Sequence, residues 1–198
     1  MGCKLGALVR ALSLLLFGAV GAAIGQERDE RFVFDVRQDG GRALIEARAE
    51  IAAPAEFVWQ TITDYDRLAE FVPGLISSRV VGRDGNTVTV EQKGELRIFF
   101  LRFPIDVTLA SIESPPFEIG VKVLRGNLRR LDGGYRIEER GANDTVLHWR
   151  GLIEPDWIMP PFIGAALLRE PMRRQFAGMV QEIGRREDRR RATIDMRR

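Results

Sequence analysis

Apolar and polar side chains alternate through the middle of this chain, which predicts a run of β-strands. The alternation is clearest at residues 87–93, 117–123 and 146–153. A period of two places one face of a strand against a core and the other face in water. Further strands are expected at residues 43–51, 76–81, 96–103, 105–112 and 128–138.

Turn-forming residues separate these strands. Residues 83–86 contain Asp84-Gly85, which is typical of a hairpin turn. Residues 114–116 and 141–144 also have the composition of turns. Pro104 indicates a bend or bulge. The Asp-Gly-Gly stretch at residues 132–134 fits either a turn or an irregular strand.

Apolar residues at helical spacing follow the first strand and return near the end of the chain. Pro54 suits the first turn of a short helix, and a second short helix is expected at residues 67–71. Phe176, Val180 and Ile183 then lie at spacings of four and three. They predict a long C-terminal helix that is kinked or restarted at Pro171. The polar residues 185–198 are expected to fray.

This order of elements predicts an α+β fold. One strand, two short helices and about six antiparallel strands precede a long helix, which gives a curved sheet of about six to seven strands in all. Such a sheet has one face to bury, and the long helix is the large apolar element that can cover it. A curved sheet around a helix leaves a cleft suited to an apolar ligand.

The N-terminal segment has the features of a secretory signal peptide. Lys4 and Arg10 are its two charges, and the uncharged run at residues 11–24 ends in small residues. This run is shorter than the roughly 20 residues of a membrane span, although an uncleaved anchor is the alternative. Cleavage near Ala23 or Gly25 predicts a periplasmic or secreted protein.

Composition and charge narrow the possible classes. The chain has 198 residues, 45% of them apolar, and a formal net charge of +2, which is enough for one ordinary domain. Its single cysteine excludes a disulfide framework and a thiolate zinc cluster. With one histidine and no second ligand at suitable spacing, no metal and no cofactor are expected.

A more specific likeness lies in the residues that follow the first strand. The pattern consists of Pro54, Phe57, Val58, Trp59, Thr63, Asp64, Tyr65, Leu68, Phe71, Val72, Pro73, Ser77 and Arg79. It resembles the opening of the polyketide cyclase/dehydrase family, which includes coenzyme Q-binding START-domain proteins, within the START-like (SRPBCC) helix-grip superfamily. The resemblance covers about residues 45–183. It implies a helix-grip fold and an apolar pocket more firmly than it implies a reaction.

We therefore expect a signal peptide (1–25), a lead-in (26–42), a helix-grip domain (43–190) and a basic tail (191–198). The expected function is to bind or carry a lipid, quinone or isoprenoid-like molecule between the sheet and the C-terminal helix. Arg150 would orient the ligand. The expected lining residues are Trp59, Tyr65, Phe71, Phe99, Leu101, Val121, Trp149, Phe162 and Phe176.

Two other functions compete with ligand binding. A cyclase or dehydratase would use at least two of Asp64, Tyr65 and His148 in one pocket. The competing interpretations are that Asp64 caps a helix, Tyr65 packs and His148 is an ordinary surface residue. An envelope interaction module would instead have a filled core and an apolar surface patch.

Arginines are concentrated in the C-terminal helix and tail. They are Arg169, Arg173, Arg174, Arg185, Arg186, Arg189, Arg190 and Arg191. We expect these arginines to form a solvated face of the helix. The alternative is that they attach the protein to anionic lipid. Export argues against a nucleic-acid partner.

Overall fold

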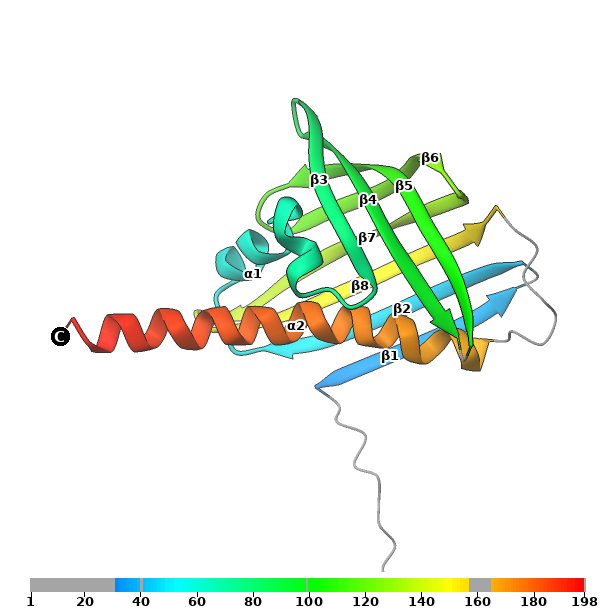
Figure 1. Ribbon diagram of the computed structural model, residues 1–198. Helices are drawn as coiled ribbons and strands as arrows, with labels where there is room; N and C mark the ends of the chain where they lie inside the picture. The colour runs from blue at the N-terminus through cyan, green and yellow to red at the C-terminus, as the bar shows by residue number, and fades with distance from the viewer. Residues whose placement is uncertain (1–30, 40, 99, 157–164, 198) are drawn as a thin grey trace, which may run out of the picture.

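The computed structural model describes residues 31–39, 41–98, 100–156 and 165–197. Their strands form one curved, antiparallel sheet in the order β1-β2-β8-β7-β6-β5-β4-β3, with helix α2 lying along it (Figure 1). The strands are β1 (Phe32–Asp39), β2 (Arg42–Ile51), β3 (Leu75–Asp84), β4 (Thr87–Ile98), β5 (Leu101–Ser114), β6 (Glu118–Gly126), β7 (Leu128–Gly141) and β8 (Asp144–Pro155). The predicted α+β helix-grip architecture is confirmed.

Strand alternation decides which side chains face α2. In β2 the odd-numbered residues from Ala43 to Ile51 are buried, while the intervening residues are partly exposed. Ala47 pairs with Trp149 of β8, and Ala49 pairs with Leu147. These residues share what we call the inner face of the sheet, and their neighbours in sequence lie on the outer face.

Two short helices close one end of the sheet. Helix α1 (Ala55–Ile62) follows Pro54, and the 3₁₀ helix η1 (Tyr65–Glu70) follows Asp64. The backbone N–H of Val80 in β3 donates to the Asp66 carboxylate at 2.7 Å. This contact attaches η1 to the edge strand of the sheet.

Helix α2 (Ala165–Asp195) runs from the ends of β4 and β5 to beyond α1 (Figure 1). Leu168, Phe176, Met179 and Ile183 are buried against the sheet at helical spacing. The ring of Phe176 lies 5.5 Å from that of Phe32 in β1. Within the described part of the chain, no helix is long and apolar enough to cross a membrane.

Several elements differ from the sequence-based expectation. Strand β1 lies within the segment expected to be a lead-in. The strand expected at residues 96–103 is instead the meeting point of β4 and β5, and Phe100 between them is 89% exposed. Residues 132–134 continue β7 as a strand. The expected fraying from residue 185 is wrong, because α2 continues to Asp195.

Candidate ligand cavity

A cavity lies between the inner face of the sheet, η1 and α2. Its first lobe has a volume of about 230 Å³ and reaches from Tyr65 and Leu68 of η1 to Phe176 and Met179 of α2. Its second lobe, of about 170 Å³, reaches to Leu168. The two lobes share Leu75, Gln92, Leu109, Leu131, Ile153, Met172 and Gln175. Because they share these walls, we treat them as one elongated cavity.

The walls of this cavity are mostly apolar, as a binding site for a hydrophobic molecule requires. The polar side chains of the first lobe belong to Tyr65, Tyr135, Ser111, Gln92 and Gln175. Among the described lining residues of both lobes, the single charged side chain is Glu95, in the second lobe. The cavity therefore offers hydrogen bonds to a ligand but no positive charge.

Tyr65 is the most unusual polar group in the wall. Its side chain is 6% exposed, and its hydroxyl has no hydrogen-bond partner among the described residues. Burial raises the pKa of this phenol, and the negative charge of Glu113 raises it further. The hydroxyl is therefore protonated, buried and left as an unpaired donor, which costs about 1–3 kcal/mol in a typical protein.

Trp149 and Tyr135 form the aromatic part of the wall. Their ring centroids are 4.6 Å apart. The Trp149 ring also lies over Gly151, where a Cβ atom would come within 2.8 Å of Cζ2. Because a side chain at position 151 would collide with the indole, glycine is needed there for the ring to lie along the strand. Burial raises the pKa of Tyr135 to about 12.

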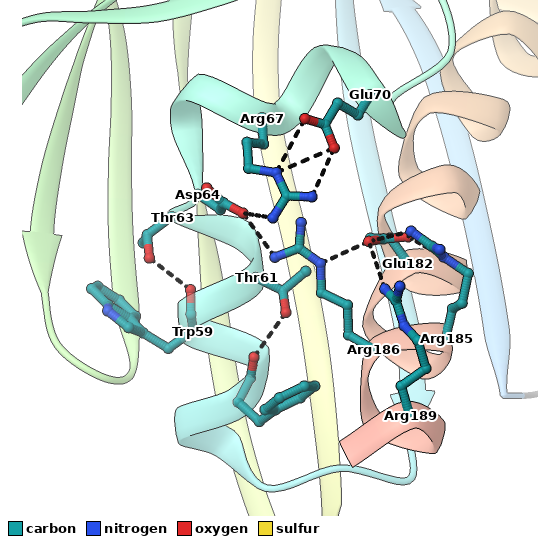
Figure 2. A network of polar contacts seen from close by, with 11 residues as sticks. Trp59, Thr61, Thr63, Asp64, Arg67, Glu70, Glu182, Arg185, Arg186 and Arg189 are labelled. Atoms are coloured by element: carbon teal, nitrogen blue, oxygen red, sulfur yellow. Dashed lines mark hydrogen bonds and ion pairs between the residues drawn. The ribbon is translucent and has the colours of Figure 1, made fainter. Parts of the chain in front are cut away.

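A network of ion pairs holds η1 against α2, and Figure 2 shows it. Arg186 of α2 donates from Nη1 to Asp64 at 2.8 Å and from Nε to Glu182 at 2.7 Å. Its guanidinium also lies over the ring of Phe71, 5.1 Å from the centroid. Arg67 of η1 donates to Glu70 at 2.8 Å. The segment that carries Tyr65 is thus fixed to the helix that closes the cavity.

Glu182 is the centre of this network on α2. Its side chain is 4% exposed, and Arg185 also donates to it at 2.7 Å. Burial alone would raise the pKa of Glu182, but hydrogen bonds from Arg186 and Arg185 outweigh burial and lower it. Glu182 is therefore an ionised, paired carboxylate with a structural role.

Further along α2, Glu187 makes a second group of ion pairs. Arg190 and Arg191 donate to it at 2.6 and 2.7 Å. The hydrogen bond from Arg190 is the main reason that the pKa of Glu187 falls to about 2. Arg191 also donates to the backbone carbonyl of Ala52 at 2.7 Å, which ties this part of α2 to the segment before α1. These pairs explain why a polar sequence remains helical.

The structure brings four of the expected ligand-binding residues together. Tyr65, Val121, Trp149 and Phe176 all line the first lobe. Trp59, Phe71 and Leu101 belong to the core or pack against it, but they do not line either lobe. Phe99 and Phe162 lie outside the described residues, as does the expected signal peptide.

Arg150 lies on the outer face of the sheet, away from the cavity. It is exposed and pairs with Glu46 at 3.4 Å. The expectation that it orients a ligand in the cavity therefore does not fit the structure. His148 shares this face and lies 3.1 Å from the Glu138 carboxylate. Asp64 is held by Arg186, so Tyr65 alone of the three suggested acid–base residues lines the cavity.

Sequence reasoning missed several polar and apolar wall residues. Ser111 and Gln92 lie on the inner faces of β5 and β4, where alternation through Val88, Val90 and Leu109 could have placed them. Leu131 was missed because the glycines that follow it resemble a turn. Met172 and Gln175 follow Pro171, where the sequence fits either a kink or a new start of the helix. The face on which they lie therefore could not be predicted.

A larger open groove, of about 1260 Å³, lies mostly on the outer face. Its walls carry charges of both signs, including Arg37, Glu46, Arg150 and His148. Several of these groups pair with one another, as Arg37 and Arg150 do with Glu46. No group of three or more potential metal ligands is found among the described residues.

Comparisons with known proteins agree with this architecture. Residues 51–180 match the family described as "Polyketide cyclase / dehydrase and lipid transport". A comparison with curated proteins finds no significant sequence match.

Three solved structures illustrate the similarity of fold. The protein TTHA0849 from Thermus thermophilus has a TM-score of 0.59 and 16% identity, covering 71% of this chain and 96% of that one. The Zhui aromatase/cyclase from a Streptomyces species has a TM-score of 0.52 and 17% identity, covering 74% and 88%. A STAR-related lipid transfer protein from Xanthomonas axonopodis has a TM-score of 0.55 and 11% identity, covering 76% and 98%. At these identities the likeness concerns the fold alone.

Proposed function

The chain belongs to the polyketide cyclase/dehydrase and lipid transport family, and we propose that it binds or carries a hydrophobic small molecule in the cell envelope. The ligand is a lipid, quinone or isoprenoid-like compound, held between the inner face of the sheet and α2. The observation that carries this proposal is the elongated apolar cavity closed by η1 and α2.

Burial of apolar surface supplies the affinity for such a ligand. Transfer of apolar surface out of water contributes roughly 25 cal/mol per Å² before the costs of association. Leu109, Ile153 and Met172 line both lobes and provide a continuous apolar surface for an extended molecule. The name of the STAR-related lipid transfer protein among the similar structures is consistent with this class of ligand.

The proposed location rests on the sequence of residues 1–25. A basic start, a short apolar run and small residues at its end are the features of an exported chain. Contact of the C-terminal arginines with anionic lipid stays a prediction. Their positive charges are partly neutralised within α2, since Arg185 and Arg186 pair with Glu182, and Arg190 and Arg191 with Glu187.

A cyclase-type reaction is the second function to consider, because an aromatase/cyclase is among the similar structures. General acid–base chemistry on a bound substrate needs at least two suitable groups close to it. Tyr65 is one such group, but Asp64 is paired with Arg186 and His148 lies on the outer face. Ligand binding is therefore better supported than this reaction.

Native mass spectrometry of the protein purified from its own periplasm tests the proposal. The expected result is a mature chain cleaved near Ala23 or Gly25 with a co-purifying apolar molecule. Met172→Trp places a large side chain where the two lobes meet and should remove that molecule. Leu124→Trp changes an exposed position and serves as the control. A wild-type protein that carries no ligand and takes up no apolar dye would contradict the proposal.

A further inference from the structure

One residue in the wall of the first lobe, Tyr65, carries a polar atom that the described residues do not satisfy. The Tyr65 hydroxyl is buried and has no hydrogen-bond partner in the described part of the chain. Ser111 lines the same lobe and, with Glu113, is close enough to influence Tyr65. Neither residue makes a hydrogen bond of good geometry to the hydroxyl. A buried donor without a partner in a cavity is a natural contact point for an acceptor on a ligand.

The Tyr65 hydroxyl acts as a donor throughout the physiological pH range. Burial and the Glu113 carboxylate raise the pKa of the phenol, so it does not ionise under these conditions. A ligand atom that accepts its proton in a hydrogen bond is an oxygen with a free lone pair, such as a carbonyl.

The charges around the cavity disfavour an anion. Glu95 is the single charged residue among the described lining residues of the two lobes, and Glu113 adds negative charge near Tyr65. Arg186 is a partly buried cation in this region that pairs through Nη1 and Nε with Asp64 and Glu182, while its Nη2 has no partner among the described residues. Arg83 also acts on Tyr65, more weakly than Glu113. Neither arginine lines the cavity. A carboxylate or phosphate in the cavity would lose its hydration without gaining a positive partner.

We propose that Tyr65 selects ligands that carry an uncharged acceptor oxygen on an apolar body, and that the cavity rejects organic anions of the same length. This inference rests on the proposed function and specifies the chemical class of its ligand. Tyr65 thus determines specificity by pairing with the ligand oxygen, while Leu109, Ile153 and Met172 contact the apolar body.

Displacement of an apolar fluorescent dye by three matched probes tests the inference. The probes are a medium-chain methyl ketone, the alkane of the same length and the fatty acid of the same length at neutral pH. The wild-type protein is expected to bind the ketone about tenfold more tightly than the alkane, the usual scale of one well-made hydrogen bond. The fatty acid anion is expected to bind more weakly than the ketone.

Tyr65→Phe should remove the preference for the ketone and leave the affinity for the alkane unchanged. His148→Ala changes a residue on the outer face that lines neither lobe, so it is the control and should keep the preference for the ketone. Equal binding of ketone and alkane by the wild-type protein, or fatty acid binding as tight as that of the ketone, would overturn the inference alone. Failure of the dye and all three probes to bind would overturn the proposed function with it.

Discussion

Arg186 of α2 and Asp64 at the start of η1 are joined by a hydrogen-bonded ion pair of 2.8 Å. The two residues are far apart in sequence, and the contact fixes the segment that carries Tyr65 to the helix that closes the cavity. Arg186 is 16% exposed and also holds Glu182. One side chain therefore links two carboxylates and two elements.

Replacing Arg186 with Leu should destabilise the protein strongly. The change removes partners from Asp64 and the nearly buried Glu182, and breaking a buried ion pair typically costs about 3–5 kcal/mol. Because Asp64 is partly exposed and Glu182 keeps Arg185, we expect about 2–4 kcal/mol in urea unfolding. Arg185→Leu is the matched change on the exposed side and should cost less. An equal loss for both variants would show that the link to Asp64 is unimportant.

The pKa of Glu187 predicts loss of stability in acid. Its carboxyl has a folded-state pKa of about 2, below its ordinary value of 4.5. A lowered folded pKa contributes stability above the unfolded value, and that contribution is lost as the pH falls from about 5 towards 2. Urea unfolding from pH 7 to pH 3 should therefore show falling stability. Glu187→Gln should reduce this slope, and an unchanged slope in the variant would contradict the assignment.

Gly178 lies where α2 passes close to the segment that follows η1. A Cβ atom there would lie 2.5 Å from the carbonyl oxygen of Phe71 and 2.5 Å from Cδ of Pro73. Gly178→Ala should therefore destabilise the protein by about 1–3 kcal/mol through overpacking. It should also weaken ligand binding, because it pushes α2 away from the segment that follows η1.

Gly184 provides the internal control for Gly178. It lies in the same helix, and a Cβ atom there meets nothing within 4 Å. Gly184→Ala should stabilise the protein by about 0.5–1 kcal/mol, because alanine is the better helix former. The melting temperatures of Gly178→Ala and Gly184→Ala, measured by thermal unfolding, test both expectations. Stabilisation by Gly178→Ala would mean that α2 is not in tight contact with Phe71 and Pro73.

Neighbouring positions on β8 should differ in their effect on ligand binding. Trp149 lines the cavity, whereas His148 and Arg150 lie on the outer face. Trp149→Ala should weaken binding of apolar probes about tenfold or more, because it removes a large buried contact. His148→Ala and Arg150→Ala should leave probe affinity within about twofold, the scale of change at a site away from the ligand. Dye-displacement titrations give all three values, and a large effect of Arg150→Ala would point to the outer groove.

Some of the cavity could be predicted from sequence because its wall residues follow the periodicity of a strand or a helix. Val121 and Trp149 lie on strands with alternating residues, and Phe176 lies on a helical apolar stripe. Each faces the cavity as expected. Arg150 was expected to face the cavity, although strand alternation from Trp149 already places it on the opposite face.

Other features depend on contacts that a local pattern does not reveal. The ends of β4 and β5 at Ile98 and Leu101 are apolar, so no turn residue marks their separation. Gly133 resembles a turn residue but lies in β7. Glycine is needed there because a Cβ atom would come within 2.5 Å of the Arg150 carbonyl oxygen. The unpaired hydroxyl of Tyr65 likewise follows from the packing of η1 against the sheet.

Helix α2 follows all eight strands in chain order. During synthesis or export, the sheet is therefore complete before its cover exists, and the aromatic rings of Phe34 and Trp149 face water until α2 docks. A nascent chain at that stage has an apolar trough that can adhere to other unfolded chains. Folding of this protein should accordingly depend on how quickly its last helix arrives, and a chaperone that shields the trough would raise its yield.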